Sequence, residues 1–398
     1  MKLKSIKQLK SLKNKIVLVR VDYNVPIKDG KVMDIERIER SFLTLNYLLK
    51  NKAKIVLISH LGKPKGKPDA KYSLRPVVRH LNNITKKKVH FVEDCLGEKV
   101  INRIAKLKAG QILLLENLRF YNGEEDNDLK FAKQLADLAE IYINDAFSVC
   151  HRSHASVVGI PKYLPAYAGY NLVDEIDNLN YLLKGFKRPA IAIIGGVKIS
   201  TKIKVINTFL KKYDYVLIGG ALANNFLAAL NLNIGKSIFE KEYLKLAKDL
   251  LKKSRAKIIV PIDLRIAKQI SAKSKVEVID VDELASYKNK NFHIIDIGPK
   301  TEIYFESFIN LAKTLAWNGP MGVFEIEKFK NGSYYIAQRF CMHAKGPSFG
   351  AVGGGETISI LENLKLKSWP DFVSTGGGAM LEFLENGILA GLKPLKRR

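Results

Sequence analysis

The strongest constraint on the fold is one pattern that repeats along all 398 residues. A short, mostly β-branched apolar run is followed by glycine or polar residues, and then by a longer amphipathic stretch. Such runs predict strands buried on both faces, and their alternation with helices predicts parallel sheets covered by helices on both sides. Expected strands lie at 16–21, 54–59, 89–92, 112–117, 141–147, 190–194, 215–218, 257–260, 293–297, 314–318, 349–352 and 371–374. Helical spacing fills the gaps, as at 36–50 and 130–141.

The chain is longer than one ordinary hydrophobic core requires, so two domains are expected. A cluster of proline and glycine at 159–171 is followed by a stretch with the apolar spacing of a helix. A single helix that connects two α/β halves is the economical interpretation. We therefore predict two doubly wound, Rossmann-like domains at 1–169 and 186–380, joined by a hinge helix at 170–185 and followed by a terminal segment at 381–398.

Composition narrows the class of protein. No apolar run approaches the roughly 20 residues of a membrane span, and the basic N-terminus lacks the apolar region of a signal peptide, so we expect a cytoplasmic protein. Three widely separated cysteines without CxxC spacing argue against a disulfide framework and a zinc site. The net charge of +27 suits either a nucleic-acid or membrane-surface partner or a solvated, lysine-rich surface. We favour the second interpretation, because no interleaved aromatics and no nucleic-acid-binding module accompany the basic residues.

Four glycine-rich stretches in the second half each follow an expected strand. One is GGGETIS at 353–359, and the others contain the glycines at 195–196, 219–220 and 376–378. Glycine after a strand lets the backbone approach a ligand closely, and the next helix start offers N–H groups to a phosphate. One such turn is weak evidence, but four favour a polyphosphate ligand. A P-loop, a dinucleotide fingerprint and the protein-kinase motifs are all missing, so the chain binds phosphate in another way.

The charged residues near these turns differ between the two halves. Lys198 and Lys202 are four apart at an expected helix start, and we favour phosphate contact over an ordinary solvated face. Glu356 has two interpretations, a Mg²⁺ ligand and an acid that complements the helix dipole. The strand ends of the first half carry Asp22, Asn24, His60, Lys63, Arg119, His151, Arg152 and His154. Arginine binds carboxylate and phosphate bidentately, so this second set suits a small, multiply anionic substrate.

Eight stretches of the sequence together resemble the phosphoglycerate kinase family, in the family's order and at its approximate spacing. They are RVDYNVP, SHLGKPKG, ENLRFYNGEE, DAFSVCHRSHAS, GGVKISTKI, WNGPMGVFE, GGGETIS and STGGGAMLEFL. The resemblance runs essentially end to end. It implies a glycolytic two-domain enzyme that transfers a phosphoryl group reversibly between ATP and 3-phosphoglycerate, with Mg²⁺, domain closure and no covalent enzyme intermediate. It also implies that the end of the chain packs back on the N-terminal domain.

Site residues follow from this resemblance, position by position. The N-terminal domain would hold 3-phosphoglycerate through Asp22, Tyr23, Asn24, Arg37, His60, Leu61, Gly62, Lys63, Arg119 and Arg152. The C-terminal domain would hold Mg-nucleotide through Gly196, Lys198, Lys202, Gly219, Gly220, Asn318, Pro320, Glu325, Gly354, Gly355, Glu356 and Thr357. Arg37, Lys198 and Lys202 would be catalytic, and Glu356 would contact the metal. Small-molecule substrates are the expected partners, and we expect a monomer.

Two residues depart from the family pattern. The family usually has arginine at the position of Lys63, so a bidentate contact becomes a point charge. It usually has aspartate at the position of Glu356, whose extra methylene moves the carboxylate by about 1 Å, a distance that can matter to catalysis. We expect an active enzyme with altered metal or nucleotide affinity.

Two other classes of function are weighed against this one. A basic RNA- or membrane-surface-binding protein on a kinase-like scaffold rests on the charge, since 50–90 holds 12 lysines and arginines and one acid. Tight, salt-sensitive RNA binding without turnover would favour that class. A nicotinamide dehydrogenase is disfavoured by the missing dinucleotide fingerprint, and specific NADH binding would revive it.

Overall fold

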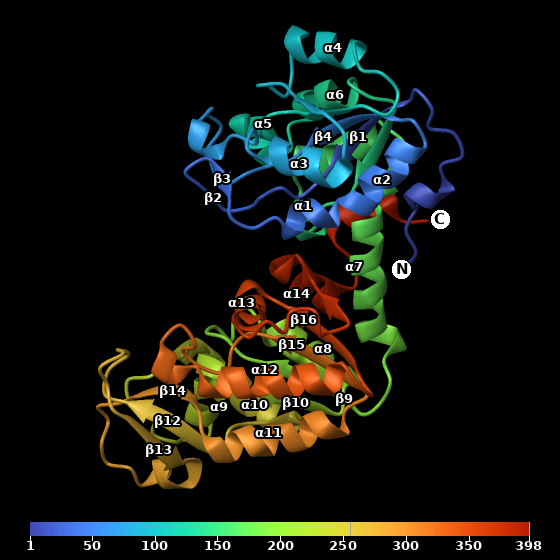
Figure 1. Cartoon of the computed structure of the whole chain (residues 1–398). Helices are drawn as coiled ribbons and strands as arrows, with labels where there is room; N and C mark the ends of the chain where they lie inside the picture. Colours follow the sequence, from blue (N-terminus) through green and yellow to red (C-terminus); the bar gives the residue numbers. More distant parts are fainter. Residues whose placement is uncertain (255, 398) are drawn as a thin grey trace. The chain divides into compact units, whose positions relative to one another are not determined.

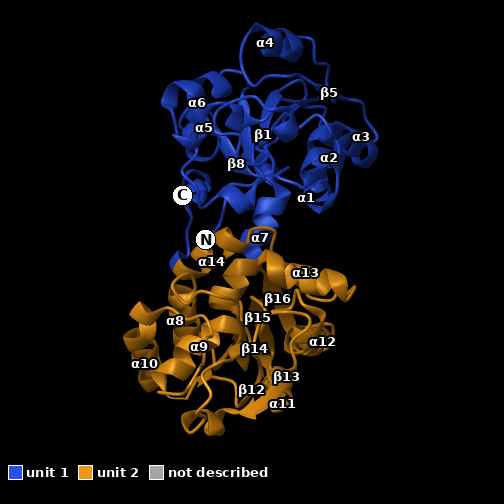
Figure 2. Cartoon of the chain, turned by 90° about the vertical axis from the view of Figure 1, so that its left-hand side faces the viewer, with its two compact units in different colours: residues 1–177, 386–398 blue, residues 178–385 orange. Residues whose placement is uncertain are grey.

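The computed structural model describes residues 1–254 and 256–397, which form two compact units (Figure 2). Unit 1 contains Met1–Asp177 and Asn386–Arg398, and unit 2 contains Asn178–Glu385. The sequence placed the domain boundaries on either side of the connecting helix, whereas the contacts divide the chain inside that helix. The difference is expected for a helix whose two ends pack on different units.

Unit 1 is built on a six-stranded parallel sheet (Figure 1). Its strands are β1 (Ile16–Arg20), β4 (Lys54–Ile58), β5 (Val89–Phe91), β6 (Ile112–Leu114), β7 (Ile141–Asn144) and β8 (Ala166–Ala168). Their order is β5-β6-β4-β1-β7-β8. The first five were expected from sequence. Strand β8 was missed because its three residues lie within the proline- and glycine-rich cluster, where we predicted no strand.

Helices cover the sheet of unit 1, and a small hairpin of β2 (Ile27–Lys28) and β3 (Lys31–Val32) precedes them. They are α1 (Glu36–Arg40), α2 (Phe42–Lys50), α3 (Val77–Thr85), α4 (Glu98–Ala105), α5 (Asn122–Glu125) and α6 (Leu129–Ala136). Val17 and Val19 of β1 share one hydrophobic cluster with Leu45 of α2 and Leu81 of α3. The single helix expected at 36–50 is interrupted at Ser41, whose hydroxyl donates to the Ile38 carbonyl at 2.7 Å.

The end of the chain packs on unit 1, as the resemblance implies. The 3₁₀ segment η11 (Ala390–Leu395) leads into two backbone hydrogen bonds with the N-terminus, from Lys4 N to Leu395 O at 2.7 Å and from Arg397 N to Lys2 O at 3.0 Å. Gly391 N donates to Cys150 O at 2.8 Å, and a Cβ at this glycine would meet the Val157 side chain at 2.5 Å. Only glycine therefore permits this close approach.

Unit 2 contains a second six-stranded parallel sheet, with the order β11-β10-β9-β15-β16-β17. The strands are β9 (Ala190–Ile194), β10 (Tyr215–Ile218), β11 (Ile258–Ile259), β15 (Thr314–Asn318), β16 (Phe349–Gly353) and β17 (Phe372–Val373). The helices around it are α8 (Ile203–Lys212), α9 (Gly220–Ala229), α10 (Leu244–Lys253), α11 (Pro299–Leu311), α12 (Asn331–Ala344), α13 (Gly355–Asn363) and α14 (Gly377–Asn386). Trp317 of β15 is fully buried against Phe340 of α12.

One expected strand of the second half does not join the parallel sheet. Strand β14 (His293–Ile297) belongs to a three-stranded antiparallel sheet with β12 (Asp263–Ala267) and β13 (Val276–Asp280). The sequence analysis missed β12 because Asp263 and Arg265 interrupt its apolar residues, and it missed β13 because that strand is largely exposed and does not form a continuous apolar run. An apolar run such as HIIDI does not reveal whether its neighbours will be parallel or antiparallel.

The connecting helix α7 (Tyr170–Asn180) is followed by a π-helical turn at Tyr181–Gly185. Within the described residues, no helix combines the length and the apolar character needed to cross a membrane. Cys95, Cys150 and Cys341 are all buried as free thiols, in line with the sequence-based expectation.

Candidate active site

The loops that follow four parallel strands of unit 1 meet at one edge of its sheet. They are the loops after β1, β4, β6 and β7, which carry Asp22, His60, Arg119 and Arg152 respectively. The carboxyl ends of parallel strands are where open α/β sheets bind ligands. The topology therefore gathers side chains that are up to 130 positions apart in the chain, from Asp22 to Arg152.

Arg37 is held beside the loop that follows β1. Its Nη1 donates to Asp22 Oδ2 at 2.7 Å and to the Asn24 carbonyl at 3.3 Å. Asp22 Oδ1 in turn accepts from Asn24 N at 3.2 Å. Asn24 Oδ1 accepts from Gly62 N at 2.9 Å and so joins this loop to the one after β4. The structure brings these four predicted residues together.

Tyr23 and Leu61 lie in the same loops, but their side chains are buried. The Tyr23 hydroxyl is 2.9 Å from Ser41 Oγ, and burial raises its pKa well above the usual range. These two residues can therefore face a ligand only through their backbone. Gly62 has a φ of +59°, and a Cβ there would lie 2.4 Å from the Tyr72 ring. Lys63, one of the two departures from the family pattern, is exposed.

His60 is buried and its tautomer is fixed by Arg20. Arg20 Nη2 lies 3.0 Å from His60 Nδ1. Because a guanidinium only donates, Nδ1 accepts and Nε2 carries the ring proton. Burial, together with the charges of Arg20, Arg119 and Arg152, lowers the pKa of His60 well below its ordinary value. His60 is thus a neutral N–H donor at neutral pH.

Arg20 contacts a residue of the candidate site, and the sequence analysis did not select it. It ends β1, is fully buried, and donates through Nε to Ser156 Oγ at 2.9 Å. Ser156 also donates to the buried Glu124 at 2.6 Å, so the arginine charge lies near a carboxylate that it does not touch directly. The available signal was an arginine at the end of an otherwise apolar strand, since a fully buried charge at a ligand-binding edge is unusual.

Arg119 and Arg152 complete the cationic set. Arg119 is 3% exposed; its Nη1 donates to Gly62 O at 2.6 Å and its Nη2 lies 3.0 Å from Glu125 Oε1. Its buried Nε has no hydrogen-bond partner among the described residues, and neither has Nδ1 of the neighbouring His151. Arg152 is half-buried, with Nε 3.4 Å from His151 Nε2. Buried donors without partners are rare in native proteins and suit a site that accepts an anion.

In unit 2, the glycine loops after β9, β10 and β15 are bonded to one another. Gly196 N donates to Pro320 O at 2.9 Å, and Gly220 N donates to Met321 O at 2.8 Å. A Cβ at Gly195 would stand 2.0 Å from Pro320 O, and one at Gly219 would stand 2.4 Å from the Met321 sulfur. Backbone packing therefore requires glycine at 195, whereas at 219 the space is limited mainly by the Met321 side chain.

Lys202 lies inside this cluster of loops. It is 8% exposed, and its Nζ donates to Gly195 O at 2.6 Å and to Asn318 O at 3.2 Å. Burial lowers its pKa to about 8, and the charge of Glu356 opposes that fall. The ammonium is thus fixed by two carbonyls at the carboxyl edge of the sheet.

The expected pairing of Lys198 with Lys202 on one helix face is wrong. Helix α8 begins only at Ile203, so both lysines precede it and do not share a helical face. Lys202 turns inward onto the carbonyls, whereas Lys198 is exposed. The turn at 195–202 forms because Gly196 adopts a φ of +94°, a conformation that a sequence pattern does not show.

The start of α13 leaves open space beside its glycines. Asn318 Nδ2 donates to Gly353 O at 2.8 Å, and Thr357 Oγ1 accepts from Gly319 N at 2.7 Å. A Cβ at Gly355 would meet no atom of the described residues within 4 Å. Glycine at 355 is therefore not required by packing, and the free volume lies at a helix start where N–H groups point outward. Glu356 is exposed in the same turn.

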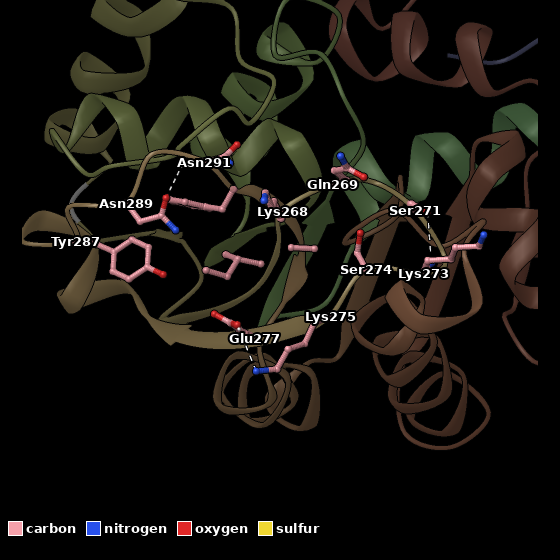
Figure 3. A pocket seen from close by; sticks show the side chains of 13 residues that line it. Lys268, Gln269, Ser271, Lys273, Ser274, Lys275, Glu277, Tyr287, Asn289 and Asn291 are labelled. Atoms are coloured by element: carbon pink, nitrogen blue, oxygen red, sulfur yellow. Dashed lines mark hydrogen bonds and ion pairs between the residues drawn. The ribbon is translucent and has the colours of Figure 1, made fainter.

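A mostly apolar cavity of about 220 Å³ adjoins these loops. Its lining includes Gly196, Gly220, Pro320, Glu325 and Glu356. A larger cavity of about 690 Å³ lies against the three-stranded sheet, as Figure 3 shows, and is lined mainly by polar side chains such as Lys268 and Asn291. It contains no residue that the sequence analysis selected, so the smaller cavity is the one that belongs to the candidate site.

The model of the phosphoglycerate kinase family matches residues 6–387. A phosphoglycerate kinase of Finegoldia magna is 43% identical over 363 residues, which cover 90% of each chain, and one of Borrelia garinii is 41% identical over the full length of both.

Solved structures agree with the sequence relatives. The structure of phosphoglycerate kinase from Coxiella burnetii has a TM-score of 0.88 and 37% identity, and covers 99% of both chains. The crystal structure of the enzyme from Pyrococcus horikoshii OT3 has a TM-score of 0.83 and 30% identity, and covers 99% of this chain and 98% of its own. Family model, relatives and structures all extend over both units, and the chain belongs to the phosphoglycerate kinase family.

Proposed function

We propose that the two strand-end sites divide the substrates between them, with 3-phosphoglycerate on unit 1 and Mg-nucleotide on unit 2. As a family member, the chain is an ATP-dependent phosphotransferase of glycolysis. The observation that carries the division is the contrast between the two edges. Among the described residues, unit 1 offers cations and buried donors that have no hydrogen-bond partner, whereas unit 2 offers glycine loops with free volume at a helix start.

On unit 1, the acceptor would be held by charge and fixed hydrogen bonds. Arg37, Arg119 and Arg152 supply guanidinium groups for a carboxylate and a phosphate. His60 would donate its Nε2 proton, because Arg20 occupies Nδ1. Asp22 would orient Arg37 and, with Asn24, bond hydroxyl groups of the glycerate. Lys63 would add a point charge from the exposed side of the site.

On unit 2, the nucleotide would lie across the glycine loops. The cavity with Glu325 at its wall suits the nucleoside, and the start of α13 suits the phosphates. Lys202 would stand beside the transferred phosphoryl group, with Lys198 contributing from the surface. Asn318 and Thr357 would contribute indirectly by holding the glycine loops in place, since their side chains form hydrogen bonds to the backbone of Gly353 and Gly319.

The transfer itself needs no nucleophile from the protein. A carboxylate oxygen of the acceptor forms a bond to the γ-phosphorus of ATP while the bond from that phosphorus to the β–γ bridging oxygen breaks. ADP leaves and an acyl phosphate results. The protein supplies position and neutralises charge on the moving group, through Arg37 and Lys202. Because the two sets of residues lie in different units, we propose that a closing movement brings them together and excludes water.

The family implies magnesium, and the residues of the candidate site could supply only a few of its ligands. Within the described part of the chain, no cluster of three His, Cys, Asp or Glu side chains could hold a metal. One exposed carboxylate beside an open helix start suits an ion that takes most of its ligands from phosphates and water. Glu356 would be that carboxylate, and the bound ion would offset phosphate charge.

The division of substrates predicts a selective change in KM. We expect His60→Ala to raise the KM for 3-phosphoglycerate about 10- to 100-fold, the range for loss of a hydrogen bond to a charged group. The KM for ATP should stay within about twofold, because His60 lies at the unit 1 edge. Steady-state kinetics in a coupled assay checks both values. His80→Ala on α3 is the matched control and should match the original chain, and a larger rise in KM for ATP would contradict the division.

Substitution of Glu356 is expected to change the dependence of the rate on Mg²⁺. We expect Glu356→Asp to retain turnover within about threefold, since the carboxylate is kept, and Glu356→Ala to raise the Mg²⁺ concentration needed for half-maximal rate about tenfold or more. Titration of Mg²⁺ at fixed total ATP measures this. Glu362→Ala, on the same helix, serves as the control. If Glu356→Ala left the Mg²⁺ dependence unchanged, the assignment would be wrong.

For the rest of the surface we propose no second partner. The lysines at 50–90 are mostly exposed, as expected for a solvated basic face. A cytoplasmic monomer without a nucleic-acid partner is the expected state, and an RNA mobility-shift series in rising salt should show no tight complex.

A further inference from the structure

Helix α7 begins with N–H groups that are bonded by side chains from elsewhere in unit 1. Asn171 N and Leu172 N both donate to Asp145 Oδ1, at 2.9 and 3.2 Å. Tyr170 N donates to Thr44 Oγ1 at 2.8 Å. The first N–H groups of a helix have no partner within it, and a side chain that accepts from them acts as an N-cap. Asp145 performs this role from 25 positions earlier in the chain.

The backbone reinforces the same contact. Asn171 Nδ2 donates to the Asp145 carbonyl at 3.0 Å, and Gly169 N donates to Asn144 O at 2.9 Å. A Cβ at Gly169 would stand 2.2 Å from Asp145 Oδ1, so only glycine allows the carboxyl group this close. Asp145 is 3% exposed, and burial raises its pKa to about 7. The N–H groups and the positive end of the helix offset the cost of burying the carboxyl group.

Asp145 is also the first residue of the loop that carries Arg152. Its N–H donates to the carbonyl of Arg20, the residue that fixes His60. Three residues later, Ser148 Oγ donates to Asp22 Oδ2 at 2.5 Å, and Arg152 N donates to Val149 O at 2.9 Å. A continuous series of bonds therefore runs from the anion-binding groups through this loop to the start of α7.

We propose that Asp145 is a positioning residue that couples the anion-binding loop at 145–154 to the first turn of α7, so that acceptor binding stabilises that turn. The inference rests on the proposed function, because it takes 3-phosphoglycerate to be held by this loop. Helix α7 passes from unit 1 into unit 2 after Asp177. Its start is thus the point at which a change in the acceptor loop reaches the connection between the units.

Hydrogen–deuterium exchange tests the coupling directly. In the full-length chain, saturating 3-phosphoglycerate should slow exchange several-fold in peptides that cover 169–176. Asp145→Ala removes the acceptor oxygen and should abolish this protection, while raising the KM for 3-phosphoglycerate about 2- to 30-fold, the range of a lost N-cap. Asp145→Asn keeps an oxygen that accepts from N–H groups and should restore both the protection and the KM.

A matched control separates coupling from simple loss of a cap. Asp128 caps α6 in the same unit through a hydrogen bond from Phe131 N at 2.7 Å. Asp128→Ala should lose a similar amount of stability but keep the protection of 169–176 by 3-phosphoglycerate. The KM for ATP should remain unchanged in all three variants.

Three outcomes would overturn the proposal. The first is that 3-phosphoglycerate, shown by calorimetry to bind the unaltered chain, leaves exchange at 169–176 unchanged. The second is that Asp145→Ala retains the protection, and the third is that Asp145→Asn loses it as fully as Asp145→Ala does. If Asp145→Ala does not fold, the unaltered chain and Asp145→Asn still decide the question. Absence of 3-phosphoglycerate binding to the unaltered chain would instead contradict the proposed function.

Discussion

Replacing Arg37 with alanine is expected to lower kcat about 100- to 1000-fold, the cost of removing one fixed group that stabilises charge in a transition state. Asp22 and the Asn24 carbonyl hold the Arg37 guanidinium at 2.7 and 3.3 Å, so its position is set before substrate binds. Arg37→Lys keeps the charge but loses the planar fork that these two acceptors orient, and should recover only part of the rate. Single-turnover and steady-state kinetics together measure the effect on the chemical step.

The control for Arg37 lies one turn away on the same helix. Arg40 pairs with Glu36 at 3.0 Å, and Arg40→Ala should leave kcat within about threefold, because this partly buried ion pair lies within α1 and is not one of the predicted site residues. A uniform loss in both variants would point to damage of α1. If single-turnover kinetics showed that Arg37→Ala leaves the rate of the chemical step unchanged, a role of Arg37 in the transfer would be contradicted.

Replacing Lys202 with methionine should have the second large effect, also about 100-fold or more in kcat. The substitution removes the cation and leaves the buried Gly195 carbonyl without its Lys202 donor, at a cost of about 1–3 kcal/mol in stability, whereas the Asn318 carbonyl still accepts from Gly195 N at 3.0 Å. Thermal unfolding and kinetics should therefore both change. Lys204→Met is the matched control, because Lys204 is exposed on the first turn of α8.

The pH dependence of nucleotide binding gives Lys202 an independent test. Its folded pKa of about 8 lies below the usual 10.5, so the buried ammonium costs stability below pH 8 and that cost is relieved as the pH rises. The affinity of the site for the phosphates of ATP should fall as the pH rises, because Lys202 loses its proton and its positive charge above about pH 8. The KM for ATP should rise between about pH 8 and pH 9, and Lys202→Met should lack this rise. A transition that persists in Lys202→Met would assign it to another group.

Much of the site could be predicted because short motifs report local backbone requirements. The glycines at 195–196 and 219–220 follow buried strands, and backbone packing alone excludes a Cβ at Gly195. The arginines and histidines of the first half lie at strand ends in the sequence, and parallel pairing brings those ends together. The roles assigned to these residues stay predictions until the variants are measured.

The errors have a common physical cause. Lys198 and Lys202 have ordinary helical spacing, yet the left-handed conformation of Gly196 delays the helix to Ile203 and sends the two side chains in different directions. Arg20 was overlooked because its contact with the His60 ring and its burial are visible only in the folded structure. The segment at 293–297 has the composition of a parallel strand, but it pairs with β12, which runs antiparallel to it.

The sequence by itself determined the α/β class, the strands of the two parallel sheets except β8, and the chemical character of each half, because these depend on residue type and near-neighbour spacing. Only the tertiary structure decided which nitrogen of His60 is free to donate, which lysine is buried against carbonyls, and that Asp145 caps a helix 25 positions later. These facts depend on hydrogen bonds between segments distant in the chain. Such bonds form only after the strands have brought the segments together, so no local pattern encodes them.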